Sequence, residues 1–197
     1  MYVAKFKIEG TSPISFCKAM ASKKPKKKSD GEWEDEIWSQ RAHVTDDGQL
    51  FIPAMALKKA LDAAAEYLSE KIAGKGNSTY SKRFRAGTAI LDDMLLVTPQ
   101  TNEAAKLCDC LKETLFVPSN GQKGGGKRVI KHFPTLKQWY VEATIHVFDE
   151  IINPELLREY LSHAGMFIGL LRWRPINGGL YGRFRILDFT HDRKETA

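Results

Sequence analysis

The sequence predicts an α+β fold in a single domain, with its major elements in the order strand, helix, strand, strand, helix, strand. Residues of alternating polarity, the pattern of a half-buried strand, occupy 2–10, 138–148 and 181–189. Apolar residues at helical spacing occupy 54–71 and the stretch after Asn153. At 197 residues, of which 43% are hydrophobic, the chain is long enough for one such domain with its own core.

The first strand and the first helix are bounded by clear signals. Alternation in the strand places lysines on one face and apolar side chains on the other, and the break at 11–13 ends it. Pro53 suits the first turn of the helix 54–71, because that turn needs no backbone N–H bond. Gly74 and Gly76 are expected to stop this helix.

The second half of the chain supplies the remaining elements. The largely apolar segment 89–97 predicts the second strand, and 102–112 predicts a short additional helix. Asn153 and Pro154 suit the start of the second major helix, which Gly165 is expected to end. This order is that of the ferredoxin-like, RRM-like core, whose helices cover one face of an antiparallel sheet. The open face is expected to carry four basic side chains, namely Lys5, Lys7, Arg183 and Arg185.

Two long segments, at about 18–49 and 99–137, are predicted to be insertions between core elements of the single domain 1–197. The first contains SKKPKKKSDG, with five lysines around a proline, and then turns acidic. We expect a mobile excursion over 21–47, either a solvated loop or a nucleic-acid finger, and a nuclear-localisation signal is a weaker alternative. The tail from His191 is polar and is expected to be loose.

The second insertion contains a basic, glycine-rich loop. Residues 118–141 include no acid, and their centre, NGQKGGGKRVIKHFP, combines glycines with lysines and an arginine. A flexible cationic segment beside an aromatic residue, here Phe133, suits a nucleic-acid backbone. The alternative is a plain flexible hairpin tip.

The stretch 165–186, GMFIGLLRWRPINGGLYGRFRI, holds five glycines and four arginines and no acid. We call residues 169–182 the Gly/Arg loop. Glycines let another chain come close, and the planar guanidinium groups of arginine suit phosphate. Trp173 and Tyr181 add faces on which a base could stack. The alternative is a glycine-rich turn before the last strand, with arginines that keep the surface soluble.

Composition favours an anionic partner. The net charge is +6 and the pI is near 9.2. No apolar run approaches the ~20 residues that span a bilayer, and the N-terminus lacks a signal-peptide core, so we expect a cytoplasmic protein without a membrane partner. The three cysteines, Cys17, Cys108 and Cys110, are expected to be reduced. The five histidines form no metal-ligand pattern and no cofactor motif is present, so neither a metal nor a cofactor is predicted.

These patterns together predict a surface that binds single-stranded nucleic acid, built from basic clusters on strands, loops and insertions. Its candidate residues are Lys5, Lys7, Lys23, Lys24, Lys26, Lys27, Lys28, Arg83, Arg85, Lys123, Lys127, Arg128, Lys131, Arg172, Trp173, Arg174, Tyr181, Arg183 and Arg185.

The phrase FIPAMALKKAL at 51–61 and the Gly/Arg loop resemble the RAMP superfamily of CRISPR-associated proteins. In the family's backbone subunits a related phrase opens the first helix, usually with glycine at the position of Lys59. Residues 10–13 and 172–182 are similar to a compact, phage- or prophage-borne relative of those subunits. The resemblance implies a palm-like ferredoxin domain with a β-hairpin thumb. It also implies assembly along single-stranded RNA, as a filament-like homo-oligomer or a ribonucleoprotein subunit, with the backbone gripped and no bases read.

Some RAMP proteins cut RNA, with a histidine or an aspartate as general base. Candidates in the corresponding region are His43, Asp30, Asp35, Asp46 and Asp47, but no pair has a diagnostic spacing and no catalytic residue is assigned. The sequence therefore favours sequence-tolerant binding, to RNA rather than DNA, without catalysis. The alternatives are a RAMP-type endoribonuclease and a viral subunit mimic that interferes with a host CRISPR complex.

Overall fold

The computed structural model describes residues 1–20, 24–119 and 127–193, and its centre is an antiparallel sheet. The strands are β1 (Tyr2–Gly10), β4 (Thr88–Ala89), β6 (Val97–Thr98), β7 (Glu103–Ala104), β10 (Tyr140–Val147) and β11 (Phe184–Arg193). Their order is β11-β1-β10-β6-β7, and β4 also pairs with β10. The three long strands β1, β10 and β11 match the predicted first, third and last strands, so an α+β fold with antiparallel sheets is confirmed.

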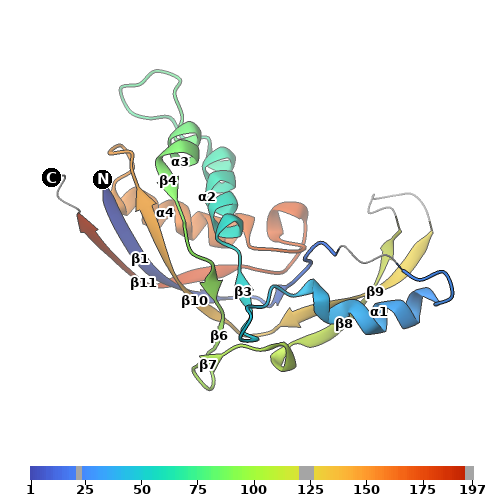
Figure 1. The fold of residues 1–197 in the computed structure, drawn as a ribbon. Coiled ribbons are helices and arrows are strands. Elements are labelled where there is room, and N and C mark those ends of the chain that lie inside the picture. The colour runs from blue at the N-terminus through green and yellow to red at the C-terminus, as the bar shows by residue number, and fades with distance from the viewer. Residues whose placement is uncertain (21–23, 120–126, 194–197) are drawn as a thin grey trace.

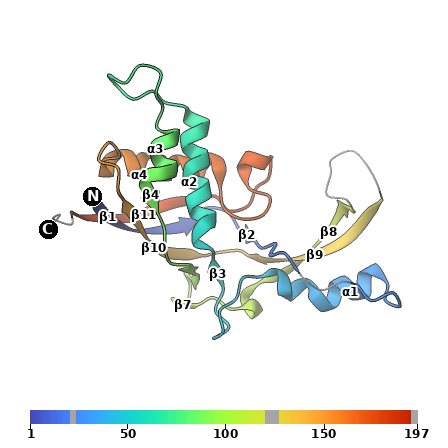
Figure 2. The ribbon, with the colours of Figure 1, turned by 45° about the horizontal axis from the view of Figure 1, so that its top comes forward.

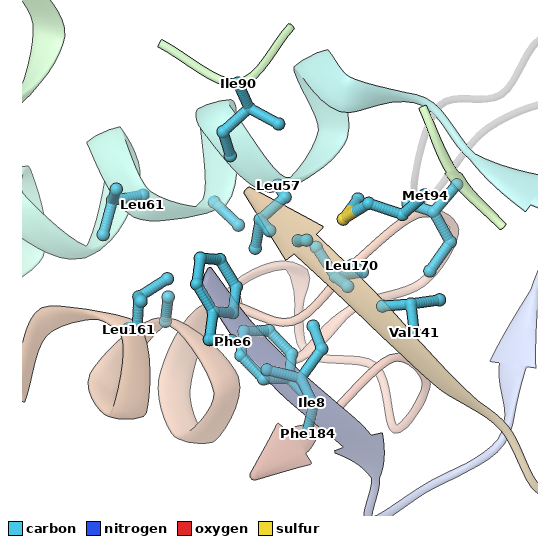
Figure 3. Close-up of a cluster of buried hydrophobic side chains, with 14 of the residues drawn as sticks. Phe6, Ile8, Leu57, Leu61, Ile90, Met94, Val141, Leu161, Leu170 and Phe184 are labelled. Carbon is cyan, nitrogen blue, oxygen red and sulfur yellow. The ribbon is translucent and has the colours of Figure 1, made fainter. Parts of the chain in front are cut away.

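Two helices, α2 (Ala54–Leu68) and α4 (Pro154–His163), cover one face of this sheet, with the short helix α3 (Ser81–Gly87) beside them (Figure 1). The core lies between helices and sheet: α2 contributes Leu57 and Leu61, and β1 contributes Phe6 and Ile8 (Figure 3). All four side chains are buried, so the predicted inner face of the first strand is confirmed. In the described part of the chain, no helix is long and apolar enough to cross a bilayer.

A second sheet forms a β-hairpin that projects away from the helices. The hairpin consists of β8 (Leu111–Pro118) and β9 (Arg128–Leu136), and β2 (Ile14–Ser15) pairs with the base of β9. Figures 1 and 2 show α1 (Asp30–Ile37) lying along the hairpin, followed by a 3-10 helix, Trp38–Arg41. A third, small sheet pairs β3 (Phe51–Ile52) with β5 (Met94–Leu95).

The acidic part of the first insertion is helical, so the expected mobile excursion is wrong there. The Ser29 hydroxyl accepts a bond from the Glu32 N–H at 3.3 Å, and the Glu32 carboxylate accepts one from the Ser29 N–H at 3.0 Å. This capping box begins α1, whose Glu34 and Ile37 are buried where the helix packs against β9. Residues 21–23, which include the first lysine of the run, lie outside the described residues.

The predicted second strand, 89–97, is broken into three short pieces. β4 and β6 pair with β10, but β5 between them pairs with β3 instead. The Asp93 carboxylate accepts a hydrogen bond from the Ala54 N–H at 2.8 Å. The chain thus leaves the central sheet at the point where it supplies a partner for a free N–H in the first turn of α2.

The short helix predicted over 102–112 is also wrong. This segment contains β7, a 3-10 turn at Leu107–Asp109 and the start of β8. Asn102 adopts a left-handed φ of 56°, which turns the chain between β6 and β7. Asparagine tolerates this conformation better than most residues, and the resulting strand pairing replaces helical hydrogen bonds.

The second major helix begins as predicted but continues beyond Gly165. Asn153 caps it, with its side-chain oxygen accepting from the Leu156 N–H at 2.8 Å. A π-helical turn, Ala164–Ile168, follows α4 and ends at Gly169, whose φ is 72°. Gly165 serves close packing instead, because a Cβ there would lie 2.2 Å from the carbonyl oxygen of Phe184.

Two further boundaries differ from the prediction. α2 ends at Leu68, well before Gly74, because Ser69 already takes a left-handed φ of 50°. The last strand begins at Phe184 and pairs with β1 through Arg193, with His191 opposite Ala4. The tail expected to be loose from His191 is therefore part of the sheet to Arg193, because pairing with β1 satisfies its backbone groups.

Candidate nucleic-acid interface

A groove of about 750 Å³ lies between the hairpin and the Gly/Arg loop. We call it the hairpin groove, and it is lined by Cys17, Arg41, Phe116, Val117, Pro118, Ser119, Arg128, Lys131, Phe133, Arg172, Trp173 and Asn177. Four of these side chains are cationic, three are aromatic, and none of the lining residues is acidic. Such a surface offers both charge for phosphates and flat faces for bases.

The Gly/Arg loop bends sharply on both sides of Arg172. Leu171 and Trp173 adopt left-handed φ values of 57° and 50°, which are unusual for residues with a Cβ. Gly179 makes this bend possible, because a Cβ there would lie 1.7 Å from the Trp173 carbonyl oxygen. The Arg172 N–H donates to the Ser15 carbonyl oxygen at 3.2 Å. Strained backbone of this kind often occurs at ligand-binding sites.

The Arg172 side chain is stacked on aromatic rings. Its guanidinium carbon lies 3.6 Å from the centroid of the Phe133 ring and 5.1 Å from that of Trp173. The Nη1 atom is buried and has no hydrogen-bond partner among the described residues. Burial lowers the pKa of Arg172, but a guanidinium group remains charged at neutral pH. The Arg172 side chain is half-buried and lines the groove, so its guanidinium group offers a positive charge to a negatively charged oxygen that enters.

The hairpin supplies the opposite wall. Phe116 is 60% exposed, and the strand register places it opposite Ile130. Arg128 and Lys131 also line the groove, and neither has a carboxylate partner among the described residues. By the strand register, Phe116 and Arg128 share one face of the hairpin, and Lys131 and Phe133 share the other. Cations and flat aromatic faces of this kind are what a single strand needs for charge neutralisation and stacking.

Arg41 differs from the other cations because its charge is already neutralised. Its guanidinium group donates to both oxygens of Glu34, at 2.7 and 3.1 Å. Both side chains are buried, with 4% of Arg41 and 7% of Glu34 exposed. The cationic groups available to a ligand are therefore Arg128, Lys131 and Arg172.

Tyr181 connects the Gly/Arg loop with the hairpin. Its hydroxyl donates to the Glu113 carboxylate on β8. Burial, followed by this hydrogen bond, raises the pKa of Tyr181 to about 12. The Tyr181 and Trp173 rings lie 6.3 Å apart, centroid to centroid. Tyr181 thus stabilises one side of the groove, although it does not line it.

The open face of the central sheet, predicted to be basic, carries paired charges. Lys7 lies 3.7 Å from the centroid of the Tyr140 ring, and its Nζ is 3.9 Å from the Glu142 carboxylate. Arg185 donates two hydrogen bonds to Glu9, at 2.9 and 2.6 Å. The structure therefore brings these two predicted residues to acids of the neighbouring strands.

Three more predicted residues lie outside the lining of the groove. Lys5 lines a separate pocket of about 370 Å³ on the open face, together with acids that include Asp92. Arg183 donates to the Met166 carbonyl oxygen and so supports the π-helical turn. Arg174 is half-buried next to the groove but is not one of its lining residues.

The other basic clusters neutralise part of their own charge. The ion pairs are Lys24–Asp30, Lys28–Glu36, Arg83–Asp149 and Arg85–Glu66. Lys26, Lys27 and Lys127 are exposed, whereas Lys23 and Lys123 lie outside the described residues. Exposed ion pairs are weak, so they restrict these lysines and arginines less than Glu34 restricts Arg41.

The groove includes residues that the sequence did not single out. Phe116, Arg41 and Asn177 were not among the candidate residues. The residues of 111–118 do not alternate in polarity, so periodicity gives no signal for this strand. Arg41 carries no such signal, because its place in the groove depends on how α1 docks on β9.

The residues considered for RNA cleavage do not line the groove. The His43 ring packs on that of Phe51, with centroids 5.5 Å apart, and burial lowers the pKa of His43. Asp35 pairs with Lys112 on the hairpin. Within residues 1–20, 24–119 and 127–193, no group of His, Cys, Asp and Glu side chains could hold a metal ion.

Comparison with known proteins identifies relatives only among solved structures. No protein-family model matches the chain, and no curated protein matches it. A chain in the cryo-EM structure of the type III-B Cmr-β bound to cognate target RNA aligns with a TM-score of 0.57 at 13% identity. The alignment covers 96% of this chain and 60% of that one. The crystal structure of Cmr6 from Pyrococcus furiosus aligns with a TM-score of 0.48 at 14% identity, covering 94% of this chain and 98% of that one.

The likeness to the Cmr-β chain is one of fold. It extends over nearly all of the present chain, which spans 60% of the length of its neighbour. The RAMP-type resemblance that the sequence predicts is therefore confirmed at the level of the fold. The phage or prophage aspect of that resemblance stays a prediction.

Proposed function

We propose that this protein binds single-stranded RNA in the hairpin groove and holds its backbone without reading the bases. The observation that carries this proposal is the lining of the groove, which includes Arg128, Lys131 and Arg172 and three aromatic residues but no acidic one. Phosphate contacts fix a strand in place but carry no sequence information. Stacking on an aromatic face tolerates every base.

The fold supports this proposal. We infer a ferredoxin-like core, because β11, β1 and β10 lie side by side in that order with β4 and β6 beside β10, and both long helices lie on one face. The Cmr-β structure that shares the fold was solved with target RNA bound. Fold alone does not define function, so the groove remains the main support.

We also propose that the protein acts as a subunit of a ribonucleoprotein, or of a homo-oligomer along the strand, and does not cut RNA. The position of His43 outside the groove lining favours binding over cleavage. Light scattering with oligonucleotides of increasing length tests assembly. Intact oligonucleotide after prolonged incubation supports binding alone, and specific cleavage products would support the endoribonuclease alternative.

Fluorescence anisotropy tests the binding itself. Oligouridylate, oligoadenylate and a mixed RNA of equal length should bind with similar Kd values, and the matching DNA more weakly. Affinity should fall steeply between about 50 and 200 mM salt, because each neutralised phosphate releases counterions. A flat salt response, or strong preference for one short sequence, would contradict the proposal.

A further inference from the structure

The helix α1 is fastened to the hairpin by a buried polar cluster behind the groove. Arg41, at the end of the 3-10 helix, donates to both carboxylate oxygens of Glu34 and to the His132 carbonyl oxygen at 3.2 Å. The His132 N–H faces Glu34 Oε2 at 3.4 Å. One carboxylate and one guanidinium group therefore join α1 to the backbone of β9 at a single residue.

A second contact joins the same two elements nearer the surface. The Asp35 carboxylate lies 3.2 Å from His132 Nε2 and also contacts the Lys112 ammonium group. The other ring nitrogen of His132 is 2.9 Å from the Thr114 hydroxyl, so His132 is held from both α1 and β8. The next residue in the chain is Phe133, and the Arg172 guanidinium group stacks on its ring.

The cluster reaches the groove through Phe133. The Arg41 guanidinium carbon lies 5.2 Å from the centroid of the Phe133 ring, and that of Arg172 lies 3.6 Å from the same centroid. Glu34 does not line the groove. It neutralises Arg41, and it fixes the β9 backbone beside the ring on which Arg172 stacks. Without Glu34, two uncompensated guanidinium groups would share one ring.

We propose that Glu34 is a positioning residue for RNA binding, acting through Arg41 and β9 to keep the Phe133–Arg172 stack formed before the ligand arrives. This inference rests on the proposed function of the groove. Preorganisation raises affinity because the ligand does not have to order the side chains that hold it. Asp35 supports the same arrangement from the surface.

The direction in which Glu34→Gln changes RNA affinity distinguishes a positioning role from a purely electrostatic one. Replacing Glu34 with glutamine removes one negative charge next to the groove, which by charge alone should strengthen binding to RNA. Loss of positioning should weaken it. A merely structural role would lower the melting temperature but leave the Kd of the folded protein unchanged.

The test compares Glu34→Gln with Asp35→Asn and with Glu36→Gln, a control with the same charge change on the exposed side of the same helix. Binding to oligouridylate is measured well below each melting temperature. We expect Glu34→Gln to weaken binding about tenfold, as indirect changes next to a site can, Asp35→Asn to weaken it less, and Glu36→Gln not to weaken it. In an Arg172→Ala background the effect of Glu34→Gln should largely disappear, because both act through one stack.

Hydrogen exchange without RNA provides a readout that does not depend on the proposed function. We expect faster exchange in β8 and β9 of Glu34→Gln and Asp35→Asn, with α2 and β10 as in the wild type. If Glu34→Gln does not fold, RNA binding and hydrogen exchange are both measured on Asp35→Asn instead. Unchanged hairpin exchange, unchanged or tighter RNA binding, or full additivity with Arg172→Ala would overturn the inference. Absence of RNA binding by the wild type would instead overturn the proposed function, and the exchange data would still decide the positioning.

Discussion

We expect binding in the groove to depend on Arg172 more than on the other lining residues. It is charged, stacked on Phe133, and carries a buried Nη1 atom with no partner among the described residues. Arg174, two positions along, has the same chemistry but lies outside the groove lining. Sequence patterns treat the two arginines alike. The difference comes from the left-handed backbone at Leu171 and Trp173, which directs the chain into the groove at Arg172 and out again.

We expect Arg172→Ala to weaken RNA binding at least tenfold for all sequences, since a buried charge-assisted hydrogen bond contributes about 1.5–3 kcal/mol. The slope of log affinity against log salt should fall by about one unit if one phosphate contact is lost. Arg174→Ala should have a smaller effect, and Arg158→Ala on the exposed side of α4 should have none. Anisotropy titrations at several salt concentrations measure all three. Equal losses for Arg172→Ala and Arg174→Ala would contradict this assignment.

The raised pKa of Tyr181 predicts how the stability of the fold depends on pH. Its pKa is raised from 10 in the unfolded chain to about 12 in the fold, so the folded state favours the neutral phenol. The stabilising contribution of this hydroxyl is therefore complete below pH 10 and is lost as the pH rises towards 12. Tyr181→Phe should lower stability by about 1 kcal/mol at pH 8, and the difference should shrink through the alkaline range. Thermal melts of both proteins from pH 8 to 12 test this, and a pH-independent difference would argue against it.

At the scale of elements, the groove exists because two irregular structures face each other. The hairpin supplies Phe116, Arg128 and Lys131, and the Gly/Arg loop supplies Arg172 and Trp173. The loop is held by its own close packing, which requires glycine at 179, and by the bond from Tyr181 to the hairpin. A change that moves the loop should therefore reduce binding without touching any ligand-contacting side chain.

Gly179→Ala makes such a change. The added Cβ would lie 1.7 Å from the Trp173 carbonyl oxygen, so the backbone must move. We expect a loss of about 1–3 kcal/mol in stability, as for other overpacked sites, and weaker binding. Gly31→Ala is the matched control, because nothing lies within 4 Å of its added Cβ, and it should leave binding unchanged. The paired measurements are melting temperature and Kd, and wild-type binding by Gly179→Ala would mean that the loop does not hold the ligand.

At the scale of the whole molecule, periodicity predicted the core better than it predicted the site. The alternation of β1 and β10 and the helical spacing of α2 and α4 reflect burial on one side of each element. A short stretch of sequence is enough to show such a pattern. The predicted second strand is not continuous in the structure, because Asp93 accepts a hydrogen bond from the first turn of α2. The sequence analysis did not predict helix α1, although Ser29 and Glu32 form its capping box. Both depend on contacts that periodicity does not measure.

The site was predicted in part because charge and glycine content are visible in the sequence, whereas ion pairing is not. Arg172, Trp173, Arg128 and Lys131 were among the candidates and meet in one groove. Other candidates, such as Arg185, face carboxylates from neighbouring strands. Tertiary packing decides which basic side chains pair with carboxylates. The groove differs from the remaining basic surface because three of its four cations have no such partner among the described residues.

The cysteines allow the most direct measurement of whether RNA occupies the groove. Cys17 is exposed and lines the groove, while Cys108 is exposed elsewhere. Burial raises the pKa of Cys110 to about 12, so its thiol should react slowly at neutral pH and leave the other two to be compared.

The measurement is the rate of alkylation of each thiol by N-ethylmaleimide, with and without oligouridylate, followed by peptide mass spectrometry. At an RNA concentration ten times its Kd, mass action leaves about one groove in eleven free, so Cys17 should react roughly tenfold more slowly. Cys108 in the same molecules should react at an unchanged rate. An unprotected Cys17 under conditions where anisotropy reports saturated binding would contradict the central claim, because the RNA would then lie on another surface.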